Sequence, residues 1–243
     1  MARHAAPAHE NRVTPHDRSL PPSLFRNREK GVQSVLRAIF TLRMPRGGRF
    51  LPWLLASVLV LASDAVAEPD IEVIFDGSRL EFRLDAVLRA RLEHVEAIVH
   101  DYSRLDRVLP LVVESRSLGA VDEGVERIST RMRGCVLFIC KEIDHVFDVR
   151  AVLGGWSSSI TVPELSRFRR GQFSWLIQPG PENPAHARMQ LYGYLEPDFA
   201  VPRLLGPALV RMWVRSELEN SVGRIERAAL ALAEARAMAA GVR

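Results

Sequence analysis

The sequence predicts an α+β domain in which a curved antiparallel sheet wraps around one long C-terminal helix. Two observations predict it. Apolar and polar residues alternate with a period of two over most of 112–195, and a helical apolar stripe then runs over 207–238. The strand-like runs are joined by short connections, which are typical of an antiparallel meander. A chain of 243 residues is long enough for one such domain with a sizeable core.

Composition and charge place the chain among globular proteins. It is 47% hydrophobic and 26% charged, which excludes long disorder and a multi-span membrane protein. The formal net charge of +4 is unevenly distributed, because residues 1–67 carry ten basic against four acidic side chains and residues 68–243 carry 23 against 25. The basic excess therefore belongs to the N-terminal segment, and the sequence predicts no nucleic-acid partner.

The end of that segment, 44–67, has the layout of a secretory signal peptide. Arg46 and Arg49 precede an apolar run over 51–62, and a motif of small residues ends at Ala67. The run is shorter than the about 20 residues that span a bilayer. We therefore expect cleavage after Ala67 and export to the periplasm or the cell exterior.

Two alternatives concern this N-terminal region. An uncleaved signal would instead anchor the protein to a membrane. Residues 1–43 are rich in Pro, His, Arg and Asn and have little apolar periodicity, so they are expected to be a disordered extension. The alternative is that translation starts at Met44 and that residues 1–43 are not part of the protein. The predicted globular domain is 68–243.

Two short strands and two helices open that domain. The strands alternate apolar and polar residues on either side of the turn Asp76-Gly77-Ser78. Apolar residues then recur at intervals of three and four, until Pro110 ends the second helical segment. These elements are expected at 71–75, 80–84, 86–100 and 103–108.

Six further strand-like runs make up the rest of the sheet. Each alternates apolar and polar residues, and short polar or Gly/Pro breaks such as Asp122-Glu123-Gly124 separate them. They are expected at 112–118, 125–132, 136–149, 151–162, 171–178 and 187–195.

The last segment, 207–238, reads as a helix. Pro207 suits its first turn, and Arg215 with Glu219 forms an i,i+4 pair away from the stripe. Gly223 interrupts the helix, where glycine costs up to about 1 kcal/mol, so it either leaves room for a ligand or admits a closely packed strand. The apolar stripe consists of Leu209, Met212, Leu218, Val222, Ile225, Ala229 and Leu232.

The two cysteines of the chain, Cys135 and Cys140, lie in the predicted domain. Export to an oxidising compartment favours their pairing. On one straight strand they would lie about 16 Å apart, far beyond the Cα separation near 7 Å that a disulfide allows, so a bridge requires the chain to turn between them. The alternative is a buried strand with two free thiols. No metal site is expected, because two further ligands are missing.

Several short motifs together resemble the START-like superfamily. They are Asp101-Tyr102 followed by Pro110, Phe168-x-x-Gly171 leading to Trp175, and Glu196-Pro197-x-Phe199-x-x-Pro202 before the long helix. Within this superfamily (SRPBCC), the chain most resembles the bacterial polyketide cyclase/dehydrase and lipid-transport proteins, which include coenzyme Q-binding proteins. The cysteine pair is similar to that of an exported branch. The resemblance covers about residues 72–235.

The resemblance implies a helix-grip fold with a hydrophobic ligand between the sheet and the C-terminal helix, but it implies no single activity. The expected partner is a hydrophobic small molecule, such as a lipid or an isoprenoid quinone, and a transient membrane contact is a further expectation. The candidate cavity residues are Trp175, Tyr192, Leu209, Met212 and Trp213.

Binding is favoured over catalysis, because no catalytic motif is present and no cofactor is indicated. The four histidines of the domain have neither metal-binding nor triad spacing, and His145 is expected to be solvated in an alternating strand. Arg131 and Arg133 share one strand face, as do Tyr192 and Tyr194. The arginines are expected on an outward, solvated face and the tyrosines in ordinary sheet packing; the alternative is that one of the pairs faces inward and orients a polar head group. The sequence therefore predicts an exported, non-enzymatic carrier. The alternatives are a cyclase- or hydrolase-like enzyme using Tyr or Asp/His acid-base chemistry, and an envelope interaction protein without a ligand.

Overall fold

The computed structural model describes residues 68–136, 139–199 and 206–241. One eight-stranded antiparallel sheet has the strand order β1-β2-β8-β7-β6-β5-β4-β3. Its strands are β1 (Asp70–Phe75), β2 (Leu80–Leu88), β3 (Val112–Asp122), β4 (Val125–Val136), β5 (Ile139–Ala151), β6 (Ser157–Thr161), β7 (Phe168–Pro179) and β8 (Ala187–Pro197). The helices are α1 (Leu92–Val99), η2 (Tyr102–Arg107), η3 (Leu153–Gly155), η4 (Pro163–Leu165) and α2 (Gly206–Gly241).

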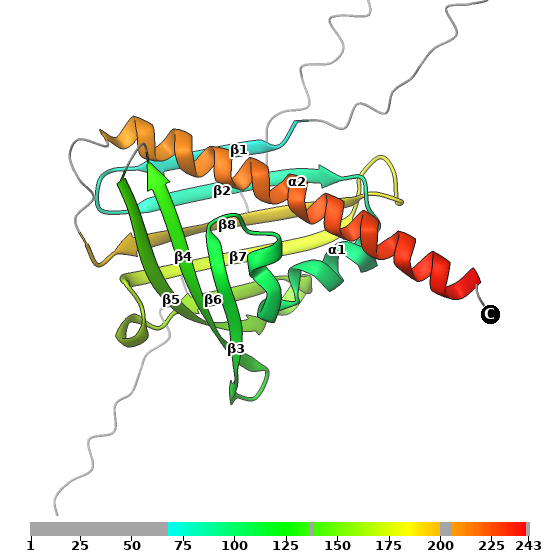
Figure 1. Ribbon diagram of the computed structural model, residues 1–243, viewed down its shortest axis with the longest axis horizontal. Helices are drawn as coiled ribbons and strands as arrows, with labels where there is room; N and C mark the ends of the chain where they lie inside the picture. Colours follow the sequence, from blue (N-terminus) through cyan, green and yellow to red (C-terminus); the bar gives the residue numbers. More distant parts are fainter. Residues whose placement is uncertain (1–67, 137–138, 200–205, 242–243) are drawn as a thin grey trace, which may run out of the picture. The chain divides into compact units, whose positions relative to one another are not determined.

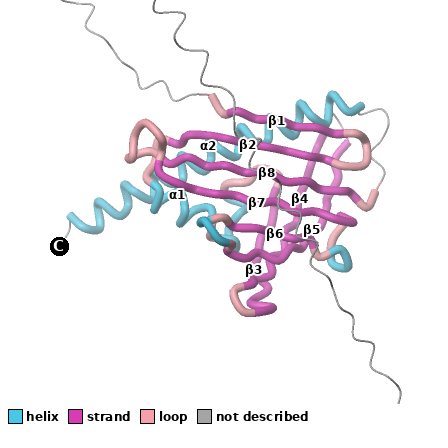
Figure 2. Tube along the Cα trace, turned by 180° about the vertical axis from the view of Figure 1, so that it is seen from behind, coloured by secondary structure: helices cyan, strands magenta, loops and turns pink. Residues whose placement is uncertain are grey.

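The sheet is strongly curved, and α2 lies across its concave face. Figure 1 shows β3 and β4 running at a steep angle to β1 and β2, with α2 in front, and Figure 2 shows the sheet from its other side. α2 contacts β1, β2, β4 and α1. The predicted fold class, a curved antiparallel sheet around a long C-terminal helix, is confirmed.

The hydrophobic core fills the space between the concave face and the helices. Alternate strand residues point into it, as in β2, where Leu84, Ala86 and Leu88 are each at most 2% exposed. From Leu218 onward, α2 contributes the apolar stripe that the sequence predicts, namely Leu218, Val222, Ile225 and Ala229. The core thus joins the first and last elements of the domain.

The helix expected at 86–100 is wrong over its first residues, because β2 continues to Leu88 and α1 begins only at Leu92. Ala86 and Leu88 fit a period of two as well as a helical spacing. The strand is favoured by pairing with β8, across which Asp85 accepts hydrogen bonds from Arg188 and from Gln190. Cross-strand pairs of this kind stabilise a sheet, and they are invisible to local periodicity.

The strand boundaries expected at 136–149 and 151–162 are also wrong. β4 continues to Val136 and β5 begins at Ile139, so the break between these two strands comes after Val136 rather than after Met132. β6 begins only at Ser157, because Gly154 and Gly155 have φ angles of 79° and 78° in the turn before it. Residues with a Cβ atom rarely adopt this left-handed backbone conformation, whereas glycine adopts it readily. The two glycines therefore permit the turn.

α2 begins at Gly206, so Pro207 occupies its first turn as expected. The apolar stripe of its first half differs from the prediction. Val214 is 7% exposed and Met212 is 63% exposed. Val214 lies eleven residues before Ile225, which is close to three full turns, whereas Met212 lies more than a third of a turn away from that line.

Candidate functional site

A hollow of about 470 Å³ opens where the α1–η2 connection meets the ends of β3 to β6. It is not the expected cavity between the sheet and the C-terminal helix, because neither α2 nor any of the five predicted cavity residues lines it. Its walls are formed by His100, Tyr102, Ala120, Gly124, Val125, Glu126, Val149, Arg150, Ala151 and Ser157. Several of these side chains are apolar and a few polar groups converge among them, which is typical of a small-molecule site.

Tyr102 is the central polar group of this hollow. Its hydroxyl is hydrogen-bonded with the side chain of Ser157, and its ring lies edge-on to the ring of Trp175, with centroids 6.2 Å apart. Burial raises the pKa of Tyr102 to about 12, with a smaller contribution from the negative charge of Glu126 and an opposing one from the Ser157 bond. The phenol therefore keeps its proton at neutral pH and is available as a donor.

Glu126 brings a carboxylate to the same wall. It lies opposite Val149 in the β4–β5 register and shares its face of β4 with the core residue Ile128. One of its oxygens accepts a hydrogen bond of 2.5 Å from the hydroxyl of Ser117 on β3. This bond holds the carboxylate in place at the end of the sheet.

His100 completes the polar rim. Its ring lies edge-on to Tyr102, with centroids 6.0 Å apart. Loss of hydration lowers the pKa of His100, and the negative charge of Glu96 opposes that shift. The imidazole is therefore neutral at pH 7.

A second hollow, of about 320 Å³, lies on the convex face over β3, β4 and β5. Arg131 crosses it, with nitrogen atoms 3.1 Å from Glu114 and 3.4 Å from Asp144. Arg133 pairs with Glu142 two residues further along the same face. The arginine pair thus faces outward as expected, and these charges are balanced by carboxylates rather than aimed at a ligand.

The structure places the five predicted cavity residues in different surroundings. Trp175 is 5% exposed and lies behind Tyr102, next to the hollow. Trp213 is half-buried and lies against Gly134 on the inner face of β4. Leu209 is half-buried near the start of α2.

The other two predicted residues lie away from the interior. Met212 is largely exposed on α2. Tyr192 is 43% exposed, and its ring lies 5.3 Å from that of Trp156. Because β8 directs Met189 and Leu191 inward, Tyr192 and Tyr194 point to the convex face, where Arg79 lies 3.8 Å above the Tyr194 ring.

His145 is buried, and the expectation that it is solvated is wrong. It is 3% exposed, its Nε2 lies 3.0 Å from the hydroxyl of Thr161, and the rings of Phe147 and Phe168 lie 5.0 and 4.9 Å away. Burial lowers the pKa of His145 to about 3, so the ring is neutral. It belongs to the packed aromatic interior rather than to the hollow.

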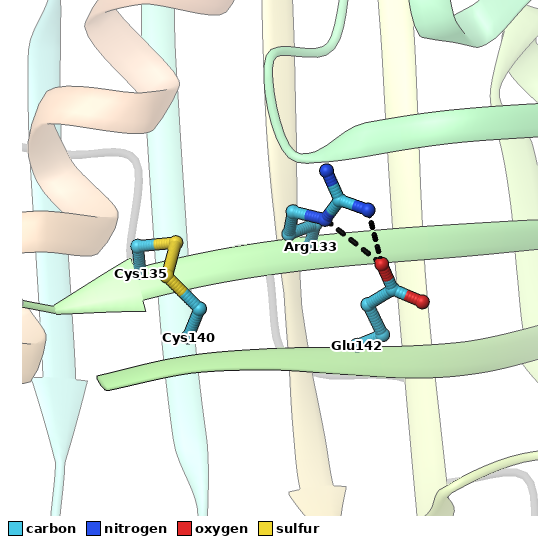
Figure 3. Close-up of a disulfide and its surroundings, with 4 residues drawn as sticks. All are labelled: Arg133, Cys135, Cys140 and Glu142. Atoms are coloured by element: carbon cyan, nitrogen blue, oxygen red, sulfur yellow. Dashed lines mark hydrogen bonds and ion pairs between the residues drawn. A yellow bond between two sulfur atoms is a disulfide. The ribbon is translucent and has the colours of Figure 1, made fainter. Parts of the chain in front are cut away.

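Cys135 and Cys140 form a disulfide, with their Cα atoms 4.0 Å apart. They are directly paired across β4 and β5, one register step beyond Gly134 and Lys141. Figure 3 shows the bridge joining the two strands beside the Arg133–Glu142 pair. The predicted pairing is confirmed, whereas the turn between them, 137–138, lies outside the described residues.

Tyr102 is part of one of the motifs that carry the START-like resemblance, whereas neither Glu126 nor Ser157 was predicted as a site residue. A signal for Glu126 was present, because it alternates with Ile128, Thr130 and Met132 and so takes a core-facing position. Ser157 had no such signal, since its role depends on contact with η2.

No group of three or more His, Cys, Asp or Glu side chains in the described ranges is arranged to hold a metal ion. No helix within the described part of the chain is long and apolar enough to cross a membrane.

No family model and no curated protein sequence matches this chain. Solved structures do match. A STAR-related lipid transfer protein of Xanthomonas axonopodis is 17% identical, with 65% of this chain and 93% of that chain covered and a TM-score of 0.50. A protein of Thermus thermophilus is 17% identical (63% and 98% covered, TM-score 0.49), and a Streptomyces aromatase/cyclase is 13% identical (67% and 98% covered, TM-score 0.47).

The likeness to the Xanthomonas protein and the sheet topology together define the class of fold. This chain has a helix-grip fold, which is the architecture that its resemblance to the START-like superfamily implied.

Proposed function

We propose that this protein is an exported carrier that binds a hydrophobic small molecule, a lipid or an isoprenoid quinone, in the hollow beside Tyr102. The observation that carries the proposal is the hollow of about 470 Å³, in which Val149 and Ala151 accompany the polar groups of Tyr102 and Glu126. Its size lies within the range of small-molecule sites. The apolar wall supplies affinity by burying ligand surface, at about 25 cal/mol per Å², and the polar groups orient the ligand.

Two further observations support a carrier outside the cytoplasm. The apolar run over 51–62 and the small residues before Glu68 favour export. The Cys135–Cys140 disulfide is a bond that persists in oxidising compartments. The Xanthomonas structure of similar fold is described as a lipid transfer protein, which supports a lipid-like cargo.

The site favours binding over acid-base catalysis. A general acid works best when its pKa lies near the working pH, and burial raises the pKa of Tyr102 to about 12. His100 is neutral but lies at the open rim. A cyclase- or hydrolase-like reaction remains the second proposal, and the test below separates the two.

The test begins with native mass spectrometry of the protein purified from its own cells without added lipid. The carrier predicts a co-purified hydrophobic molecule released unchanged on denaturation. A protein that carries no such molecule and converts an ester or polyketide-like compound would instead support the enzyme.

A matched pair of variants then locates the site. Ala151 lies opposite Ser157 in the β5–β6 register and lines the hollow, so Ala151→Trp is expected to fill it and abolish binding of 2-naphthol or the co-purified molecule. Ala97→Trp, on the exposed side of α1, is the control and should bind normally. Equal binding by both variants, with the fold intact by circular dichroism, would overturn the assignment of this hollow.

A further inference from the structure

We propose that this hollow selects apolar molecules that carry an uncharged hydroxyl group, such as an alcohol, a phenol or a hydroquinone, over molecules that carry a carboxylate. The inference rests on the proposed function, because it names the class of ligand for the same site. Glu126, Tyr102 and Ser157 are the residues that make the selection.

In the described part of the chain, the hollow is lined by one carboxylate, that of Glu126, so it carries a negative charge. Glu126 is on the inner face of β4 and is held by Ser117, so its carboxylate cannot simply swing away from a ligand. A ligand carboxylate would enter beside this negative charge, and like charges at short range repel each other. A neutral hydroxyl has no such penalty.

Among the described residues that line the hollow, no cationic side chain lies on the same strand face as Glu126 to balance its charge. Arg150 is the one cationic residue that lines the hollow among those described, and it is paired with Val125 in the register. Strand alternation directs Arg150 to the opposite face from Val149 and Ala151. The Arg150 side chain therefore leaves the strand on the face opposite to Glu126, and the imidazole of His100, beside Tyr102, is neutral.

The hydrogen-bond donors and acceptors that line the hollow also favour a ligand hydroxyl over a ligand carboxylate. A hydroxyl group both donates and accepts. It can donate to the carboxylate of Glu126 and accept from the neutral phenol of Tyr102, whose proton is retained at neutral pH. A carboxylate can only accept, so it adds no donor for Glu126 beyond the hydroxyl of Ser117.

Trp175 adds a donor beside this group. Its indole nitrogen Nε1 is buried and has no hydrogen-bond partner among the described residues. Trp175 is the register partner of Ser157, and its ring contacts Tyr102. Buried donors in native proteins are rarely left unpaired. Trp175 does not itself line the hollow, so only a ligand that reaches past Ser157 would satisfy this donor.

The experiment compares three probes of one shape, 2-naphthol, 2-naphthoate and naphthalene, by calorimetric titration of the full chain at pH 7. At this pH 2-naphthol is uncharged and 2-naphthoate is an anion. We expect 2-naphthol to bind at least tenfold more tightly than 2-naphthoate. We also expect it to bind more tightly than naphthalene, because only 2-naphthol gains the hydrogen bonds.

Glu126→Gln removes the charge while keeping the shape and an acceptor for Ser117. It should strengthen binding of 2-naphthoate severalfold and narrow the difference between the two probes. Glu182→Gln, in the exposed β7–β8 turn, changes the net charge equally and should leave that difference unchanged.

The remaining outcomes contradict either the hydroxyl selection or the proposed function. If 2-naphthoate binds as tightly as 2-naphthol, or if Glu126→Gln leaves the difference unchanged, the hydroxyl selection is wrong while the carrier proposal stands. If none of the three probes binds, and none displaces a co-purified molecule, the proposed function itself is wrong.

Discussion

The indole of Trp213 on α2 lies against the backbone of Gly134 on β4. A Cβ atom added at Gly134 would lie 2.8 Å from Cη2 and 3.0 Å from Cζ2 of that ring. This contact joins the first half of α2 to the concave face, one register step from the Cys135–Cys140 disulfide.

Gly134→Ala should therefore destabilise the protein. The new methyl group would overlap a bulky ring, and overpacking of this kind costs about 1–3 kcal/mol. Thermal and urea unfolding measure the change. In a Trp213→Ala background the same glycine substitution should cost much less, because the overlapping ring is gone. An equal cost in both backgrounds would show that Trp213 is not the cause.

Gly223→Ala should have the opposite effect. A Cβ atom there would meet only Nη1 of Arg227, at 3.3 Å, and that flexible side chain can move. The structure thus gives Gly223 no closely packed strand, and the glycine does not line the hollow beside Tyr102. We expect a gain of up to about 1 kcal/mol in the free energy of unfolding, from helix propensity alone. A loss of stability would indicate a contact at this position that the structure does not contain.

Reduction of the disulfide should lower stability modestly. The bridge closes a short loop of the β4–β5 hairpin, so the chain-entropy model gives a contribution of about 2 kcal/mol. Intact-mass measurement should show a gain of two hydrogens on reduction, and Cys135→Ser should unfold at a lower urea concentration. Full alkylation of the unreduced native protein would contradict the bridge.

Stability should fall on acidification because of His145. Its pKa is about 3 in the folded protein and near 6.5 when unfolded, so between these values only the unfolded chain binds the proton. Stability is therefore lost as the pH falls from 6.5 towards 3, by up to about 1.4 kcal/mol per pH unit.

His145→Gln tests this dependence, because glutamine can still bond Thr161 and does not titrate. Its baseline stability will be lower, since the aromatic contacts are lost, but its unfolding free energy should vary less between pH 7 and 4. Parallel curves for the two proteins would show that His145 does not contribute.

Processing at the predicted signal can be measured directly. N-terminal sequencing of the protein recovered from outside the cytoplasm should begin at Glu68, because the small residues before it form the predicted cleavage motif. Recovery of an intact N-terminus from a membrane fraction would instead establish an uncleaved anchor.

Local periodicity identified the meander and α2, but it failed where two periods fit the same residues. Ala86 and Leu88 satisfied both a helix and a strand, and pairing of Asp85 with Arg188 on a distant strand decided between them. His145 was misjudged for a related reason. Alternation shows which residues share a face, but only the packing of Phe168 and Thr161 shows that this face is buried.

The sequence by itself determined the order and type of most elements and the need for a turn between Cys135 and Cys140. These depend on residues that are near neighbours along the chain. Tertiary structure alone decided the site, because Tyr102, Glu126 and Ser157 come from η2, β4 and β6 and meet only when the sheet curves around the helices. It also decided that Trp213 lies on the inner face while Met212 is exposed, since this depends on how α2 is rotated against the sheet.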